Sequence, residues 1–138
     1  MPDLVRTGIS LERGLLDRFD RAIRKKGYQN RSEAIRDLVR DYAVAEDIEE
    51  DRTVVGSLTV VYDHHRPRLS EHLIDIQHHS RGKVIAATHV HLDESNCLEV
   101  IIIKGRSSEV RRVADQILSL RGVKHGKLVL TTQGKGLE

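Results

Sequence analysis

Two periodicities in the order of apolar and polar residues predict where helices and strands lie. Residues 4–11 alternate between apolar and polar positions, which predicts a strand. Apolar residues recur at helical spacing over 15–23, and again over 35–42 behind a capping-box pattern at 30–33. The N-terminal part of the chain is therefore predicted to be strand–helix–helix.

The rest of the chain predicts four strands and two helices in the order βαββαβ, which is the ferredoxin-like arrangement. The acidic stretch at 46–51, with five acids in six residues, predicts a solvated linker or a frayed helix end. The fold class is thus α+β, with one domain at 1–46 and another at 52–138. Strands are expected at about 53–62, 84–92, 97–104 and 123–131, and helices at about 69–79 and 108–120.

The first domain is too small to stand alone, because a lone strand leaves two edges unpaired. Two chains can solve this by pairing their first strands antiparallel over a helical support, which is the ribbon-helix-helix plan for DNA binding. The pattern leaves open an alternative, an edge strand inside a larger fold. In the DNA-binding case, the strand would face base edges and the start of the second helix would face phosphates. The residues expected to contact DNA are Arg6, Gly8, Ser10, Asn30, Arg31, Ser32 and Arg36.

Composition narrows the class of protein. The 138 residues are 38% hydrophobic and 32% charged, as in a globular protein, and the net charge of +2 does not indicate general polyanion binding. The few aromatic residues argue against a reader of single-stranded nucleic acid. The longest apolar runs are too short to cross a membrane, no signal peptide is recognisable, and the single cysteine suits a reducing compartment. We therefore expect a cytoplasmic protein with no membrane partner.

Histidine is the outlier, because seven of the eight histidines lie between His64 and His91. His89 and His91 share one face of a predicted strand, roughly 6–7 Å apart at the backbone. Cys97 follows after a short turn, and His78 lies near the end of the preceding helix. Three imidazoles and a thiolate suit Ni(II), Cu(II), Co(II) or Zn(II), and not Mg or Ca.

Other interpretations of these residues remain open. A single histidine is more often a surface or core residue than a ligand, and a lone cysteine is more often an inert thiol. A catalytic Cys–His pair is a further alternative. However, the sequence has neither a nucleophile elbow nor a glycine-rich phosphate loop to support an enzyme. We therefore expect no enzyme and no small-molecule substrate.

The chain contains the segment Gly27–Asp37, GYQNRSEAIRD, and the segment Arg121–Gly126. It also contains the long spacing His64-x13-His78-x10-His89-x-His91-x5-Cys97. With these motifs the chain resembles the NikR family of nickel-responsive transcriptional regulators over nearly its whole length. This resemblance implies an N-terminal ribbon-helix-helix domain, a C-terminal ACT-type ferredoxin-like domain, and a homotetramer built as a dimer of dimers.

The resemblance also implies roles for individual residues. His89, His91 and Cys97 of one chain would bind about one Ni(2+) per subunit together with His78 of another chain. Arg6 matches the base-reading arginine of the family, whereas Gly8 falls where some members carry a hydroxyl residue. The candidates for supporting roles are Gln77 and Glu99, which would hydrogen-bond to the ligands, and His64 and His79, which would form a weaker auxiliary metal site.

Glu33 and Asp37 match carboxylates that hold an alkali-metal ion such as K(+) between the two domains in the family. A capping glutamate and a solvated aspartate are the alternative interpretation. The function that the sequence predicts is a nickel-activated repressor that binds double-stranded operator DNA at nickel-uptake genes. A metal-buffering or metal-delivery protein with the same ligands is the alternative.

Overall fold

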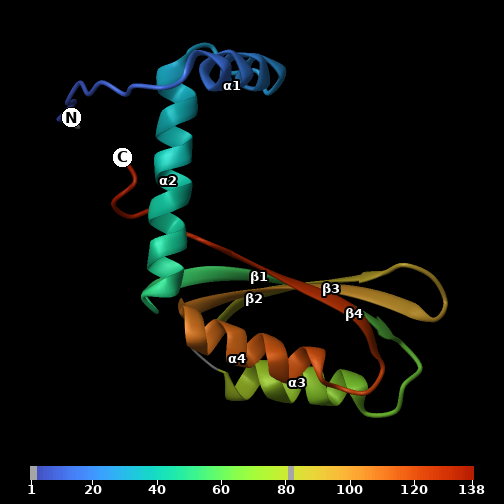
Figure 1. Ribbon diagram of the computed structural model, residues 1–138. Coiled ribbons are helices and arrows are strands. Elements are labelled where there is room, and N and C mark those ends of the chain that lie inside the picture. The colour runs from blue at the N-terminus through green and yellow to red at the C-terminus, as the bar shows by residue number, and fades with distance from the viewer. Residues whose placement is uncertain (1–2, 81–82) are drawn as a thin grey trace. The chain divides into compact units, whose positions relative to one another are not determined.

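The computed structural model describes residues 3–80 and 83–138, and Figure 1 shows its elements along the chain. The chain forms two compact units, one of residues up to Ala43 with Lys135–Glu138, and another of Val44–Gly134. Residues 1 and 2 of the predicted first domain lie outside the described residues. The elements are α1 (Arg13–Lys25), α2 (Arg31–Glu49), β1 (Thr53–Asp63), α3 (Leu69–His79), β2 (Val84–His91), β3 (Asn96–Arg106), α4 (Ser107–Leu118) and β4 (Val123–Thr131).

In the first unit, a tight reversal separates α1 from α2. Gly27 has φ 87°, a left-handed conformation that glycine adopts without steric cost, so α1 ends there. The side chain of Asn30 then accepts a 3.0 Å hydrogen bond from the backbone N–H of Glu33, which caps the start of α2. The capping residue and both helices are therefore as the sequence predicts.

The strand predicted at residues 4–11 does not form in the single chain. Residues 3–12 are neither helix nor strand, and their side chains are exposed to solvent. The physical reason is that a strand needs a neighbour to accept and donate its backbone hydrogen bonds. In the predicted ribbon that neighbour is the same strand of a second chain.

The second unit is a four-stranded antiparallel sheet in the order β2-β3-β1-β4. Figure 1 shows α3 and α4 together on one face of this sheet. The order βαββαβ with this strand order is the ferredoxin-like topology, which confirms the predicted fold class. No helix in the described ranges is long and apolar enough to cross a membrane.

Strict alternation along the two central strands makes the core. Every second residue is buried beneath the helices from Val54 to Tyr62 on β1 and from Cys97 to Ile103 on β3, and the residues between them face the other side of the sheet. The buried core residues of the sheet and helices are Val54, Leu58, Val60, Tyr62, Leu69, Leu73, Cys97, Ile101, Ile103, Val110, Val113, Ala114 and Ile117. Cys97 therefore lies on the helix-covered face of the sheet, near the start of β3 and beside the end of β1.

Candidate metal centre

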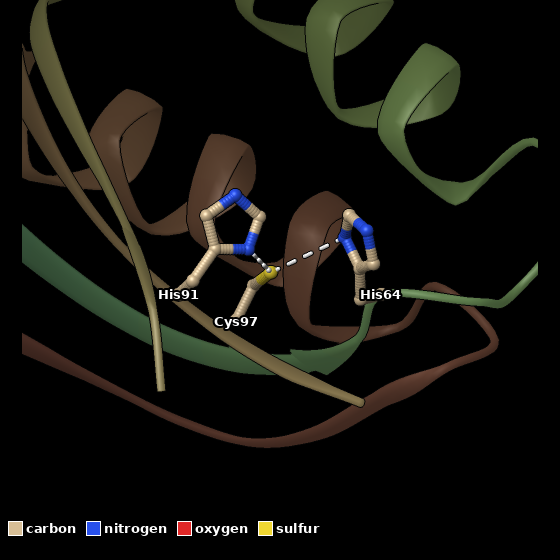
Figure 2. A group of neighbouring side chains, drawn as sticks. All are labelled: His64, His91 and Cys97. Atoms are coloured by element: carbon tan, nitrogen blue, oxygen red, sulfur yellow. Dashed lines mark hydrogen bonds between the residues drawn. The ribbon is translucent and has the colours of Figure 1, made fainter. Parts of the chain in front are cut away.

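Three donor side chains meet where β1 and β2 end and β3 begins. The Sγ atom of Cys97 lies 3.3 Å from Nδ1 of His91 and 3.4 Å from Nδ1 of His64 (Figure 2). The donor atoms of these three residues all lie within 4.8 Å of one another. Cys97 is buried, whereas both histidines are exposed. The cluster is thus open to solvent on the imidazole side.

Strand register explains why these residues meet. Cys97 on β3 pairs with His91 on β2 and with Tyr62 on β1, so the three strands place their ends side by side. His64 follows directly after β1, and its N–H donates a 2.7 Å hydrogen bond to the carbonyl of Ser95. This bond between two loops holds the His64 backbone next to the start of β3.

The turn between β2 and β3 is fixed by Asp93. Its Oδ1 atom accepts 2.8 Å hydrogen bonds from the N–H groups of Ser95 and Asn96. The hydrogen bond from the Asn96 side chain, more than any other contact, lowers the pKa of Asp93, so the carboxylate stays charged and the turn stays closed. The short turn that the sequence predicts before Cys97 is therefore present, and Asp93 holds it closed.

His89 lies beside this cluster and is held by Tyr62. The ring centroids of His89 and His91 are 4.9 Å apart, in agreement with the predicted shared face of the strand. Nδ1 of His89 is 2.9 Å from the hydroxyl oxygen of Tyr62. Burial, followed by the charges of Glu99 and Cys97, raises the pKa of Tyr62 to about 12, so the phenol keeps its proton. This contact orients the imidazole and leaves Nε2 available to a metal.

His78 is not part of the group of three within this chain. It is exposed at the last turn of α3, where its ring packs edge-on against that of His79 at 6.3 Å between centroids. Nδ1 of His79 lies 2.7 Å from the carbonyl of Asp75. In the described ranges, His64 with His91 and Cys97 is the group of three or more such donors that could hold a metal. The sequence includes His64 as the first residue of the family spacing, but that spacing does not show which histidine lies next to Cys97.

The two residues expected to support the ligands contact each other. Nε2 of Gln77 donates a 3.2 Å hydrogen bond to Oε1 of Glu99, which is 9% exposed and pairs with His89 across β2 and β3. Glu99 and His89 also line a pocket of about 270 Å³ together with Tyr62, Ser70, Leu73 and Ile74. The pocket thus places polar side chains next to His89, where they can orient its imidazole as a metal ligand.

The donors fit a transition metal. Imidazole nitrogen and cysteine sulfur suit Ni(II), Cu(II), Co(II) and Zn(II), whereas Mg and Ca prefer oxygen ligands. Burial raises the pKa of the Cys97 thiol above its ordinary value, with smaller contributions from Asp93 and Glu99. A bound cation would offset this effect because its charge stabilises the thiolate.

The residues expected to contact DNA lie in the first unit. Arg6, Gly8 and Ser10 are exposed within residues 3–12, and Ser32 and Arg36 are exposed on the first turns of α2. Asn30 uses its side chain to cap α2. Arg31 makes two 2.8 Å hydrogen bonds to the carboxylate of Asp20, which links α2 to α1.

The carboxylates expected to hold an alkali-metal ion have contacts within the same unit. Asp37 accepts a 2.6 Å hydrogen bond from the hydroxyl of Tyr28 and a 3.1 Å hydrogen bond from Arg40. The Tyr28 hydrogen bond is the largest cause of a lowered pKa at Asp37. Glu33 accepts a 3.4 Å hydrogen bond from the N–H of Gln29. Both carboxylates thus already accept hydrogen bonds from groups of this chain, and only their remaining oxygen lone pairs could bind a cation.

Comparison with known proteins decides the family. Residues 55–131 match the family model of the NikR C-terminal nickel binding domain, and residues 5–46 match that of the ribbon-helix-helix proteins of the copG family. The chain belongs to the NikR family. The resemblance found in the sequence is thereby confirmed over both parts of the chain.

Two relatives show how completely the NikR family covers the chain. A protein of Geobacter sp. (strain M21) is 52% identical over 138 residues, which is 99% of each chain. One of Thermococcus onnurineus (strain NA1) is 47% identical over 135 residues, 97% of this chain and 98% of the relative. Both bear the name "Putative nickel-responsive regulator".

A solved structure supports the fold of the second unit. An uncharacterized protein of Thermotoga maritima superimposes with a TM-score of 0.52 at 13% identity, covering 59% of this chain and all of that chain. At this identity the likeness concerns the fold alone. It agrees with the ferredoxin-like topology described above.

Proposed function

We propose that this chain is a nickel-responsive, sequence-specific DNA-binding regulator that represses nickel-uptake genes when Ni(II) is bound. The observation that carries the proposal is the meeting of Cys97 with His91 and His64 at 3.3 and 3.4 Å, on a chain whose residues 5–46 match ribbon-helix-helix proteins. A thiolate among imidazoles supplies the ligand chemistry for nickel, and the N-terminal match supplies the DNA-binding part. Such a regulator acts in the cytoplasm, where its DNA is.

For the high-affinity site we propose His89, His91 and Cys97 of one chain with His78 of a second chain, at about one Ni(II) per subunit. His89 and His91 lie on one face of β2 with their rings 4.9 Å apart, and Cys97 faces His91. His78 is exposed at the end of α3, so its imidazole is free to reach a metal ion held by a neighbouring chain. His64 then serves as the auxiliary donor beside Cys97, with His79 as a second auxiliary candidate.

The ligand set requires oligomerisation, and exposed apolar residues support it. On the sheet face opposite the helices, Val90 and Val129 are 43% and 59% exposed. The segment before α1, α1 itself and α2 also expose large apolar side chains, which are Leu4, Val5, Ile9, Leu11, Leu15, Leu38, Val39 and Tyr42. Apolar surface of this extent is typical of an interface. We propose a homotetramer in which the first units pair as dimers and the second units form the central contact.

In this arrangement the paired N-terminal strands would enter the major groove, with Arg6, Gly8 and Ser10 toward the bases. The start of α2 would direct backbone N–H groups to a phosphate, where Asn30, Ser32 and Arg36 lie. An alkali-metal ion held by Glu33 and Asp37 would share the Asp37 carboxylate with Tyr28 and Arg40, which hydrogen-bond to it.

A binding experiment tests this function against metal buffering. The full chain is titrated onto DNA from upstream of its own and neighbouring genes, with and without Ni(II), alongside Cys97→Ala. We expect nickel to tighten operator binding about a hundredfold, which needs a coupling of about 2.7 kcal/mol, within the usual allosteric range. A chain that binds nickel tightly yet has the same DNA affinity with and without it would instead be a metal-buffering or delivery protein.

A further inference from the structure

The end of α2 is fastened to the start of α4 by the side chain of Asp51. The Asp51 carboxylate accepts hydrogen bonds from Ser108, at 2.7 Å from its N–H and 2.9 Å from its hydroxyl. The Ser107 hydroxyl lies 3.1 Å from the same carboxylate. An acidic group at a helix N-terminus satisfies N–H groups that the helix itself leaves without a partner. Asp51 thus caps α4 from a position 56 residues earlier in the chain.

Ser107 completes this contact from the other side. It is 4% exposed, and its hydroxyl oxygen lies 2.6 Å from the carbonyl of Ile48. A hydroxyl carries one proton, so the nearer acceptor, the Ile48 carbonyl, receives it. The last carbonyls of a helix lack partners within that helix, and this bond supplies one at the end of α2. The N–H of Ser107 also donates to the carbonyl of Arg52 at 3.2 Å. We call Asp51, Ser107 and Ser108 the α2–α4 clamp.

The backbone of Asp51 is shaped for this role. Its φ is 57°, in the left-handed region that residues other than glycine seldom adopt. The hydrogen bond from the Ser108 backbone is the largest cause of a lowered pKa at Asp51, so the capping carboxylate is charged. An unfavourable backbone conformation persists where surrounding contacts hold it, and here the clamp supplies those contacts.

The clamp lies at a place where it can connect the two proposed activities. α2 starts in the first unit, at the turn expected to face phosphate, and runs without interruption to Glu49 in the second unit. Ile48, in its last turn, packs against the core of the second unit. α4 packs on β1, β3 and α3, which are the elements that carry Cys97 and His78 and lead to His64. The clamp therefore lies within the second unit and holds the last turn of the helix whose first turns belong to the first unit.

We propose that Asp51 and Ser107 are positioning residues that couple metal binding to DNA affinity by holding the last turn of α2 to α4. The inference rests on the proposed function and adds the element through which it is regulated. α4 does not depend on the clamp for its place, because Val110, Ala114 and Ile117 bury it on the sheet. Loss of the clamp is therefore expected to loosen the end of α2 while leaving the metal centre intact.

Four variants of the full chain separate the parts of this proposal, and one of them, Ser107→Ala, removes the hydroxyl that bonds the Ile48 carbonyl. Asp51→Gly removes the carboxylate but accommodates the positive φ, so it tests the side-chain bonds alone. Asp51→Asn keeps an acceptor oxygen and tolerates the left-handed conformation, so it should partly rescue. Asp47→Asn is the matched control, because Asp47 bonds Arg52 at 3.2 Å in the same turn but lies outside the clamp.

For each variant, DNA affinity is measured with and without Ni(II), together with nickel affinity and thermal unfolding. We expect Asp51→Gly to bind nickel as the original chain does. The factor by which nickel raises its DNA affinity should, however, be smaller by about tenfold or more. Asp51→Asn should lose less, Asp47→Asn none, and Ser107→Ala should reproduce the loss. These variants should remain folded at the measurement temperature.

Two results would overturn the proposal. In one, Asp51→Gly and Ser107→Ala keep the full nickel-driven gain. In the other, they weaken DNA binding equally with and without nickel, which is the mark of a purely structural role. If the unmodified chain itself shows no nickel-driven gain, the proposed function fails, and that outcome is visible before any variant is compared.

Discussion

Asp20 and Arg31 are joined by two parallel hydrogen bonds of 2.8 Å, from Nε to Oδ1 and from Nη2 to Oδ2. This two-point contact connects the middle of α1 to the first residue of α2. A bidentate arginine–carboxylate pair fixes orientation as well as distance. Arg31, which the sequence predicts as a phosphate contact, thus has a position set by α1.

The first prediction concerns this pair and pH. The hydrogen bond from Arg31, more than any other contact, lowers the pKa of Asp20 below its ordinary value of 3.8. A group whose pKa is lowered by folding stabilises the fold above its ordinary value, and this contribution is lost as pH falls through the folded value. Asp20→Asn should therefore lower Tm at pH 7, and the difference in Tm from the original chain should shrink below about pH 4.

A charge swap is the control for this prediction. Asp20→Arg combined with Arg31→Asp should recover much of the Tm that either single change loses, because the pair is restored in reverse. A difference in Tm between Asp20→Asn and the original chain that is the same at pH 3 and pH 7 would contradict the assigned cause.

The second prediction concerns metal binding. Cys97 is buried with imidazole nitrogens 3.3 and 3.4 Å from its sulfur, so we expect it to supply the thiolate ligand. Ni(II) should bind at about one ion per chain, with a thiolate-to-metal absorption band and a diamagnetic, four-coordinate centre. Cys97→Ala should lose the band and the tight binding. His125→Ala is the control, because His125 is exposed on β4 and outside the cluster, and it should change neither.

The third prediction separates the two ligand sets that contain Cys97. If His78 of another chain is the fourth ligand, His78→Ala should lose tight binding and His64→Ala should keep it. Mixed tetramers of His78→Ala and Cys97→Ala chains should then recover some complete sites, since each chain supplies what the other lacks. The reverse ranking, with no recovery in verified mixed tetramers, would favour the group of His64, His91 and Cys97 within one chain.

The regular elements of the second unit could be predicted because their signals are local. The apolar alternation of β1 and β3 comes from burial on one face, so the printed residues show it directly. The start of α4 is different, because its cap is Asp51, far away in sequence, and the predicted start at 108 falls one residue late. Of the two interpretations of the acidic stretch, a linker or a helix end, the structure has the helix end, because α2 continues to Glu49 and stops there.

The cluster could be predicted only where its residues are close in sequence. His91 and Cys97 are joined by one short turn, and the pairing of β2 with β3 brings them together. The approach of His64 depends on a bond between two loops, from its N–H to the Ser95 carbonyl, which no spacing rule contains. We propose that the strand at 4–11 and the ligand role of His78 both need a second chain, which is why the single chain forms neither a strand at 4–11 nor a contact between His78 and Cys97 within the described residues.

The last prediction concerns how the N-terminal segment reads DNA. Arg6 is exposed on the polar side of the segment predicted to form the ribbon, where a guanidinium can bond O6 and N7 of a guanine together. Arg6→Ala should weaken operator binding by about tenfold or more, relax the preference at one base pair per half-site, and leave nickel affinity unchanged.

Arg36 provides the comparison, because it is exposed on the first turns of α2, where phosphate is expected. Arg36→Ala should weaken binding to operator and to scrambled DNA alike and should flatten the dependence of affinity on salt, since fewer counterions are released. The measurement is a salt titration of both variants on both DNAs. If Arg6→Ala loses the same affinity on scrambled DNA as on the operator, Arg6 contacts only phosphate, and the ribbon does not read bases through this residue.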